Sequence, residues 1–148
     1  MKGLKKLVGI SLQEIQPDSV KISRLIIAAA RNLSDAGVTE ISFENRFDAA
    51  YKSLMQSANA ALQASGYRTL TSKPGHHQTM LQLLVKTAGV GREVVIILDA
   101  LRRQRNVVDY SGDLVPYSAV KECVSQAEYL LKQVRYWIST HYPDLILG

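Results

Sequence analysis

This 148-residue sequence has little cysteine, no long apolar run and no leader-like start, and each absence excludes a class of protein. Cys123 is the only cysteine, so no disulfide can form within the chain. The longest apolar runs, Leu25–Ala30 and Val94–Leu98, are far shorter than the ~20 residues of a membrane span. Residues 1–10 lack a long apolar core and a small-residue cleavage site, so we expect no signal peptide. We therefore expect a cytoplasmic protein with no membrane partner.

The composition is that of an ordinary folded protein, with 47% hydrophobic and 21% charged residues. A chain of this length fits one domain that is large enough to bury a core. The net charge of +5 permits a polyanionic partner such as RNA or DNA but does not require one.

Apolar residues recur at spacings of three and four along most of the chain, which is the pattern of amphipathic helices. Asp18 or Ser19 is a suitable N-cap for the first long helix, and Ser42 is a suitable N-cap for the second. Gly37 and Gly66 are typical of the residues that follow helix ends. Helices are predicted at about 19–36, from Ser42 to Gly66, and at about 76–86, 92–110 and 118–141.

The fold class follows from these elements. No segment shows the strict alternation of a half-buried strand, and no fixed-period repeat appears. We predict an all-α fold, namely an up-and-down four-helix bundle with an additional short helix. Residues 1–17 are predicted to be a basic N-terminal lead-in, and residues 18–143 the helical bundle.

The helix predicted at 92–110 interrupts its apolar stripe near its end. The stripe is formed by Val94, Ile97, Leu98 and Leu101. Arg105 takes a following position on this stripe, where an arginine is costly unless a partner pairs with it or a ligand needs it. Asp109 lies four residues further on the same face, and Asn106 and Tyr110 form the adjacent i, i+4 pair. Arg105 and Asp109 are therefore either a structural ion pair within the helix or part of a ligand site.

A cluster of arginines and a pair of histidines can also be interpreted in more than one way. Arg102 and Arg103 form a basic cluster with Arg105, which is either a solvated face or a face that contacts phosphate. His76 and His77 point about 100° apart on a helix and have no histidine at i+4, so no metal site is predicted. The segment 75–78 is better suited to a helix start, whose N–H groups can bind an anion.

Three short motifs, in this order, resemble small bacterial members of the HEPN superfamily (higher eukaryotes and prokaryotes nucleotide-binding). They are Arg46-Phe-Asp-Ala-Ala-Tyr51, Ser72-Lys73 and Arg105-Asn-Val-Val-Asp-Tyr110, and the likeness spans roughly residues 20–140. The order of the elements is fairly specific, whereas each motif alone is weak. The resemblance implies a helical bundle that binds RNA or a nucleotide in a cleft between two copies of the chain.

Catalytic members of that superfamily carry an arginine, usually a polar residue after it, and a histidine four to six residues on. They cleave RNA without a metal or cofactor, with the 2′-hydroxyl as nucleophile. Arg105 and Asn106 match the first half of this motif, but Tyr110 stands near the place of the histidine. An unperturbed tyrosine is only about 0.1% ionised at neutral pH, so Tyr110 is a poor general base.

The resemblance implies an endoribonuclease with a degenerate motif, in a toxin–antitoxin or defence module. In this interpretation Arg105 contacts phosphate, and Asn106 orients it. Asp109 holds Arg105 in place, Tyr110 hydrogen-bonds the ribose or phosphate, and Arg102 and Arg103 contact the nucleic acid.

A second interpretation is a non-catalytic interaction domain that pairs with itself or with a minimal nucleotidyltransferase. The missing histidine favours this interpretation, and Arg105 and Asp109 would then be a structural pair. The resemblance also makes Tyr110 a candidate for adenylylation by such a partner. A third interpretation, an enzyme acting on a small phosphorylated molecule, depends on the same arginines.

Overall fold

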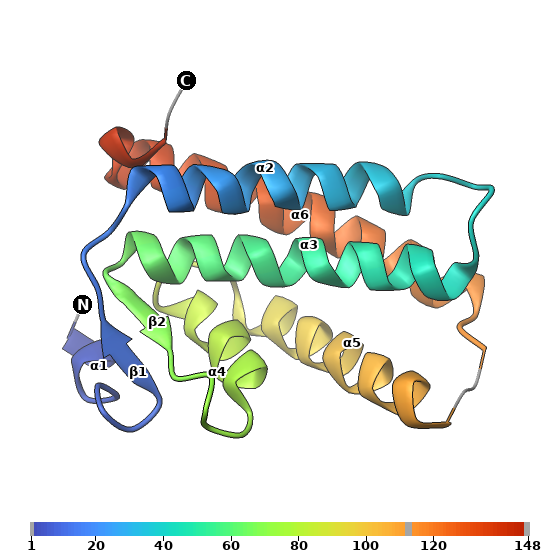
Figure 1. Cartoon of the computed structure of the whole chain (residues 1–148), viewed down its shortest axis with the longest axis horizontal. Helices are drawn as coiled ribbons and strands as arrows, with labels where there is room; N and C mark the ends of the chain where they lie inside the picture. Colours follow the sequence, from blue (N-terminus) through green and yellow to red (C-terminus); the bar gives the residue numbers. More distant parts are fainter. Residues whose placement is uncertain (1, 112–113, 147–148) are drawn as a thin grey trace.

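The structure of the protein is a computed structural model that describes residues 2–111 and 114–146, without the side chains of residue 2 and residues 108–111. It is mostly helical, with one small two-stranded sheet (Figure 1). No helix in the described ranges is both long enough and apolar enough to span a bilayer. The elements in chain order are α1 (Lys2–Lys5), β1 (Leu12–Glu14), α2 (Ser19–Ala36), α3 (Phe43–Ala64), β2 (Tyr67–Thr69), α4 (His76–Gln82), the 3₁₀ turn η1 (Leu83–Val85), α5 (Arg92–Ser111), α6 (Tyr117–His141) and the 3₁₀ turn η2 (Pro143–Leu145).

Helix α3 is the central element, and it packs against both α2 and α6 (Figure 1). The predicted caps at its start and at the start of α2 are confirmed. The Asp18 carboxylate accepts a hydrogen bond from the Val20 N–H at 2.9 Å, and the Ser42 hydroxyl accepts one from the Asn45 N–H at 3.1 Å. Small residues on α3 allow close packing of its neighbours, and those that are fully or almost fully buried are Ala50, Ser53, Ser57, Ala58, Ala60, Ala61 and Ala64.

Helix α5 is less closely joined to the bundle than the other long helices. It packs beside α4 and η1, makes few contacts with α3 and α6, and diverges from α3 towards its C-terminal end (Figure 1). Its buried residues Val95, Leu98 and Leu101 all lie in its first half. Among the later residues of α5 whose side chains are described, none is buried, and Val107 is 58% exposed. From Arg102 to Val107, α5 therefore adds no side chain to the core, and Arg105 lies in this part of the helix.

The mostly helical structure agrees with the all-α prediction and adds two short strands that the sequence did not predict. β1 and β2 pair antiparallel, with Leu12 opposite Thr69 and Glu14 opposite Tyr67. Strands of three residues are too short to show a period of two in the sequence, which is why the pattern did not reveal them. Leu4 and Leu12 have no exposed surface, so the basic lead-in packs on the same core as the helices.

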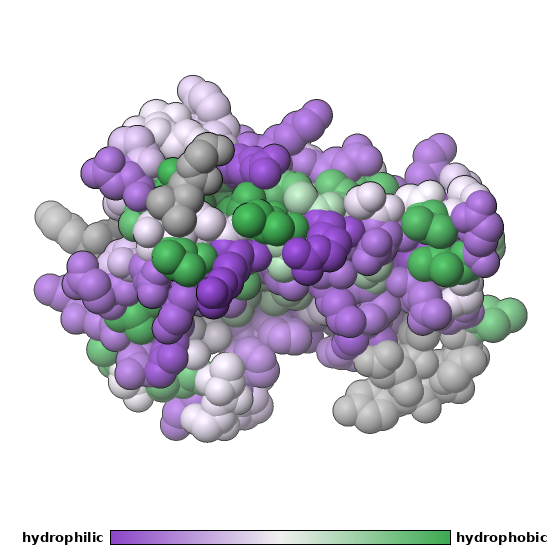
Figure 2. All heavy atoms as spheres, turned by 45° about the horizontal axis from the view of Figure 1, so that its top comes forward, coloured by the Kyte–Doolittle hydropathy of each residue, from purple (hydrophilic) through white to green (hydrophobic). Residues whose placement is uncertain are grey.

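The surface seen in Figure 2 is mainly hydrophilic, and its apolar residues form small separate patches. Exposed apolar side chains also include residues of α5 and of the start of α6. Ile96 is 67% exposed, and Tyr117 is 54% exposed.

Ser53 and Ser57 allow a matched test of buried polar packing on α3. Both are fully buried, and the Ser53 hydroxyl donates to the Ala29 carbonyl of α2 at 2.8 Å. Within the described part of the chain, the Ser57 hydroxyl has no hydrogen-bond partner. We expect Ser53→Ala to lower the free energy of unfolding by about 1 kcal/mol and Ser57→Ala to leave it unchanged or raise it. Urea denaturation followed by circular dichroism measures both, and equal losses would contradict the assignment.

Candidate functional site

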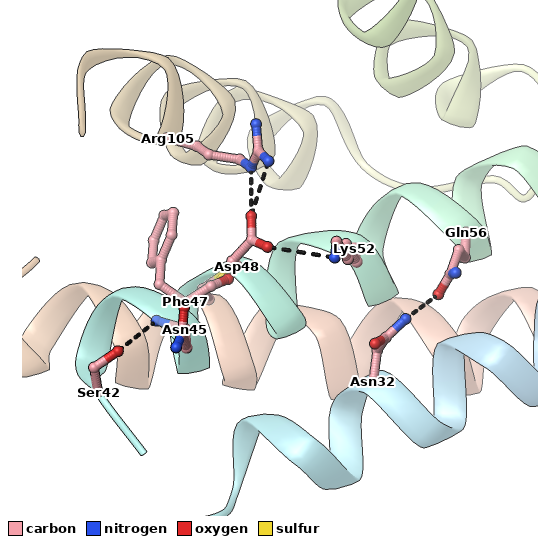
Figure 3. Close-up of polar contacts among 9 residues, drawn as sticks. Asn32, Ser42, Asn45, Phe47, Asp48, Lys52, Gln56 and Arg105 are labelled. Atoms are coloured by element: carbon pink, nitrogen blue, oxygen red, sulfur yellow. Dashed lines mark hydrogen bonds and ion pairs between the residues drawn. The ribbon is translucent and has the colours of Figure 1, made fainter. Parts of the chain in front are cut away.

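Arg105 connects α5 to α3 through Asp48. Its Nε and Nη2 atoms lie 2.9 and 2.8 Å from Oδ1 of Asp48 (Figure 3). The other carboxylate oxygen of Asp48 lies 3.5 Å from Nζ of Lys52. The Arg105 guanidinium also lies over the ring of Tyr51, 5.1 Å from its centroid. Arg105 therefore has a partner on another helix, in a place where α5 and α3 otherwise make few contacts.

The sequence did not suggest Asp48 as a partner of Arg105. Asp109 was expected to hold Arg105, and the structure places the Asp48 carboxylate against it. The side chains of Asp109 and Tyr110 lie outside the described part of the structure, so their roles remain predictions. Asp48 lies 57 residues from Arg105, and no local spacing could have paired them.

Arg102 and Arg103 share one carboxylate, that of Asp99. The Asp99 oxygens lie 2.8 Å from Nε of Arg102 and 3.0 Å from Nη2 of Arg103. The side chain of Arg102 is only 15% exposed, whereas that of Arg103 is 67% exposed. Arg103 is therefore solvated, as one of the two predicted alternatives has it, whereas Arg102 is mostly buried.

Arg102 and Asn106 meet two histidines of α4 in a small hollow that we call the histidine pocket. It has a volume of about 170 Å³ and is lined by Gly75, His76, His77, Gln78, Arg102 and Asn106. The two imidazole rings meet edge to face, with centroids 4.5 Å apart. α4 begins at His76, after Gly75 with φ of 76°, a conformation that favours glycine. The fold thus brings two predicted site residues together with histidines that lie far away in the sequence.

Tyr51 joins the histidine pocket to the Arg105–Asp48 pair. It is 3% exposed, and its hydroxyl lies 3.4 Å from Nδ1 of His77. Its ring is the surface on which the Arg105 guanidinium rests. Arg105 and His77 therefore contact the same buried side chain from two different helices.

The protonation states follow from burial and from the arginines. Desolvation lowers the pKa of His77, and the positive charges of His76, Arg105 and Arg102 lower it further. Burial raises the pKa of Tyr51 to about 12, against the opposing effect of the arginines. His77 is therefore neutral and Tyr51 protonated at pH 7, so His77 can accept a proton there.

Four cationic side chains gather around the site, and two carboxylates lie among them. Asp99 pairs with Arg102 and Arg103, and Asp48 pairs with Arg105 and Lys52. In residues 2–111 and 114–146, no group of three or more His, Cys, Asp and Glu side chains is placed to hold a metal ion. The site can therefore attract an anion and exchange protons through imidazole.

Comparison with protein-family models finds no match for this chain, and comparison with curated proteins finds none either. The chemistry of the site is therefore inferred from its own geometry.

The residues that the sequence did not single out as a site are Asp48, Tyr51, His76 and His77. His76 and His77 were considered only as metal ligands and as a helix start, and Asp48 and Tyr51 appeared only within the motif Arg46-Phe-Asp-Ala-Ala-Tyr51. The adjacent histidines and this motif were the visible signals. Nothing in the spacing indicated that α4 lies beside the middle of α5.

A double-mutant cycle on Arg105 and Asp48 tests whether this pair fastens α5 to α3. We expect a coupling of about 1 kcal/mol in the free energy of unfolding, because the pair is partly buried and has two contacts to one oxygen. Arg103→Ala is the matched control on the same helix and should cost less than about 0.5 kcal/mol. Chemical denaturation of the four proteins measures the coupling. Additive effects of the two substitutions would show that the contact does not hold the helices together.

Proposed function

We propose that this protein is an RNA-binding domain of the HEPN type that cleaves its substrate without a metal ion. In this proposal α5 completes a four-helix bundle, and the histidine pocket is the reaction centre. The observation that carries the proposal is the meeting of His76 and His77 with Arg102 and Asn106 in one hollow, beside Arg105. α4 supplies the imidazole that the motif after Arg105 lacks.

The chemistry requires a base, an acid and a group that binds phosphate. If Nδ1–H of His77 donates to the Tyr51 oxygen, Nε2 is free to take the proton of a ribose 2′-hydroxyl. The 2′-oxygen then attacks phosphorus, the bond from phosphorus to the 5′-oxygen breaks, and a 2′,3′-cyclic phosphate forms. His76 donates a proton to the leaving oxygen, while Arg102 and Asn106 bind the phosphate oxygens. His76, His77, Arg102 and Asn106 all line the pocket.

Electrostatics support a polyanionic substrate. Arg102 lines the histidine pocket, and the charges of Arg105 and Arg102 both act on His77. Such a surface attracts phosphate groups, and its attraction weakens with salt. The net charge of +5 acts in the same direction over longer distances.

Cleavage of single-stranded RNA in EDTA tests this function. We expect His77→Ala and His76→Ala each to lower the rate by about 100-fold or more, because each removes a proton-transfer group. Arg102→Ala should weaken RNA binding as well as cleavage. Arg135→Ala, which removes an exposed arginine of α6, is the control and should retain the activity. Gel analysis of end-labelled RNA measures the rates.

The pH dependence of the same assay provides an independent check. A base is active above its pKa, and the pKa of His77 lies below the ordinary value of 6.5. The rate should therefore persist below pH 6.5 and fall only in more acidic buffer. Cleavage that is equal in the wild-type and His77→Ala proteins would refute the proposal.

A second candidate function is that of an interaction domain, and exposed apolar residues on α5 favour it. A groove of about 270 Å³ lies between α5 and α6, with Leu101 and Ala119 in its walls. Ile96 and Val107 of α5 are 67% and 58% exposed, and Leu114, which lies between α5 and α6 in the chain, is 84% exposed. A second copy of the chain or a nucleotidyltransferase could cover them, and a second copy would bring two sites together.

Sedimentation equilibrium tests self-association through this face. The wild-type protein should form a dimer at micromolar concentration, and Val107→Glu should shift it to a monomer because a charge would be buried. Ile27→Glu is the control, since Ile27 is equally exposed but lies on α2. If the wild-type protein is monomeric, self-association is excluded, and the partner at this face would have to be a different protein.

A further inference from the structure

A second hollow lies on the other side of Asp48, between the end of α2 and the start of α3, and we call it the α2–α3 groove. Its volume is about 370 Å³, within the range of small-molecule sites. Asp48 and Lys52 are part of its wall. Since Asp48 also holds Arg105, the α2–α3 groove meets the cationic cluster of the candidate site (Figure 3).

The lining of the α2–α3 groove combines an apolar surface with hydrogen-bonding groups. Val38 and Ile41 are partly exposed apolar side chains that offer a surface to a flat ring. Asn32 donates from Nδ2 to Gln56 at 2.8 Å, which leaves its carbonyl oxygen as an acceptor (Figure 3). The lining also contains Asn45, whose side-chain amide has no hydrogen bond within the described residues, and the Asp35 carboxylate, which has no ion pair within the same part of the chain.

We infer that the α2–α3 groove binds the base of a ribonucleotide, with the phosphate directed towards Lys52 and Arg105. An apolar surface suits the faces of a base, and carboxylate and amide oxygens accept hydrogen bonds from exocyclic amino groups. Adenine, guanine and cytosine carry such a group, and uracil does not. The inference rests on the proposed function, because it makes the α2–α3 groove the place of a nucleotide next to the cleaved bond.

A series of contacts joins the α2–α3 groove to the histidine pocket, and through it both hollows can act on one RNA strand. Asp48 binds Arg105, Arg105 lies on Tyr51, and Tyr51 contacts His77 of the histidine pocket. In the free protein Asp48 neutralises Arg105 and Lys52, so a phosphate has to compete with this carboxylate. A nucleotide therefore gains its affinity from the base as well as from its charge.

Another groove of similar size does not fit such a ligand. This other hollow is lined by Lys21, Arg24, Leu25, Ala28 and Gln63 and lacks a carboxylate. The α2–α3 groove beside Asp48 carries both the acceptors and the nearby cations that a nucleotide requires.

Isothermal titration of the wild-type protein with AMP, GMP, CMP, UMP and inorganic phosphate tests the inference. The three nucleotides with an amino group should each bind about 10-fold more tightly than UMP, which corresponds to one specific hydrogen-bonded contact. Asn45→Ala should reduce this preference to less than about 3-fold while leaving phosphate binding unchanged. Asn59→Ala makes the same change elsewhere on α3 and is the matched control. Lys52→Ala should weaken all ligands alike.

The outcomes separate this inference from the proposed function. Equal binding of the four nucleotides, binding of phosphate alone, or a preference that survives Asn45→Ala would each overturn the groove as a base site. If RNA cleavage still depends on His77 in that case, the proposed function holds without a base site in the α2–α3 groove. A base preference that persists in His77→Ala, where cleavage is lost, would support the α2–α3 groove as a separate base site.

Discussion

The contact between Asp48 and Arg105 is the interaction on which the candidate site depends. Between Arg102 and Val107, α5 contributes no buried side chain. In this part of the helix a carboxylate with two guanidinium contacts at 2.8 and 2.9 Å joins α5 to α3. Because this ion pair is partly exposed, it can exchange partners at a small cost, which a fully buried pair could not.

The site combines this ion pair with a buried tyrosine and two histidines. Tyr51 separates the Arg105 guanidinium from the His77 ring and contacts both. The arginines help to keep His77 neutral, and the same arginines attract a phosphate group. Anion binding and proton transfer are therefore coupled in the proposed mechanism, since a bound phosphate would offset the charges that lower the pKa of His77.

The loose attachment of α5 connects the site to assembly. A helix with an exposed apolar face and few contacts to its own bundle is suited to packing against another chain. In the proposed dimer, α5 would carry Arg102, Arg105 and Asn106 close to a second copy of the chain. The α2–α3 groove lies on the opposite side of Asp48, where a nucleotide can reach it from solvent.

The sequence by itself determined the mostly helical fold and the main helix starts, because apolar periodicity and the Asp18 and Ser42 caps are local signals. It also singled out Arg105, because a charged residue in line with an apolar stripe can be recognised from the sequence of a single helix. It missed the strands, which are too short to show a period. Only the tertiary structure decided that Asp48 holds Arg105 and that His77 lies near it, because such contacts depend on how helices distant in the chain cross.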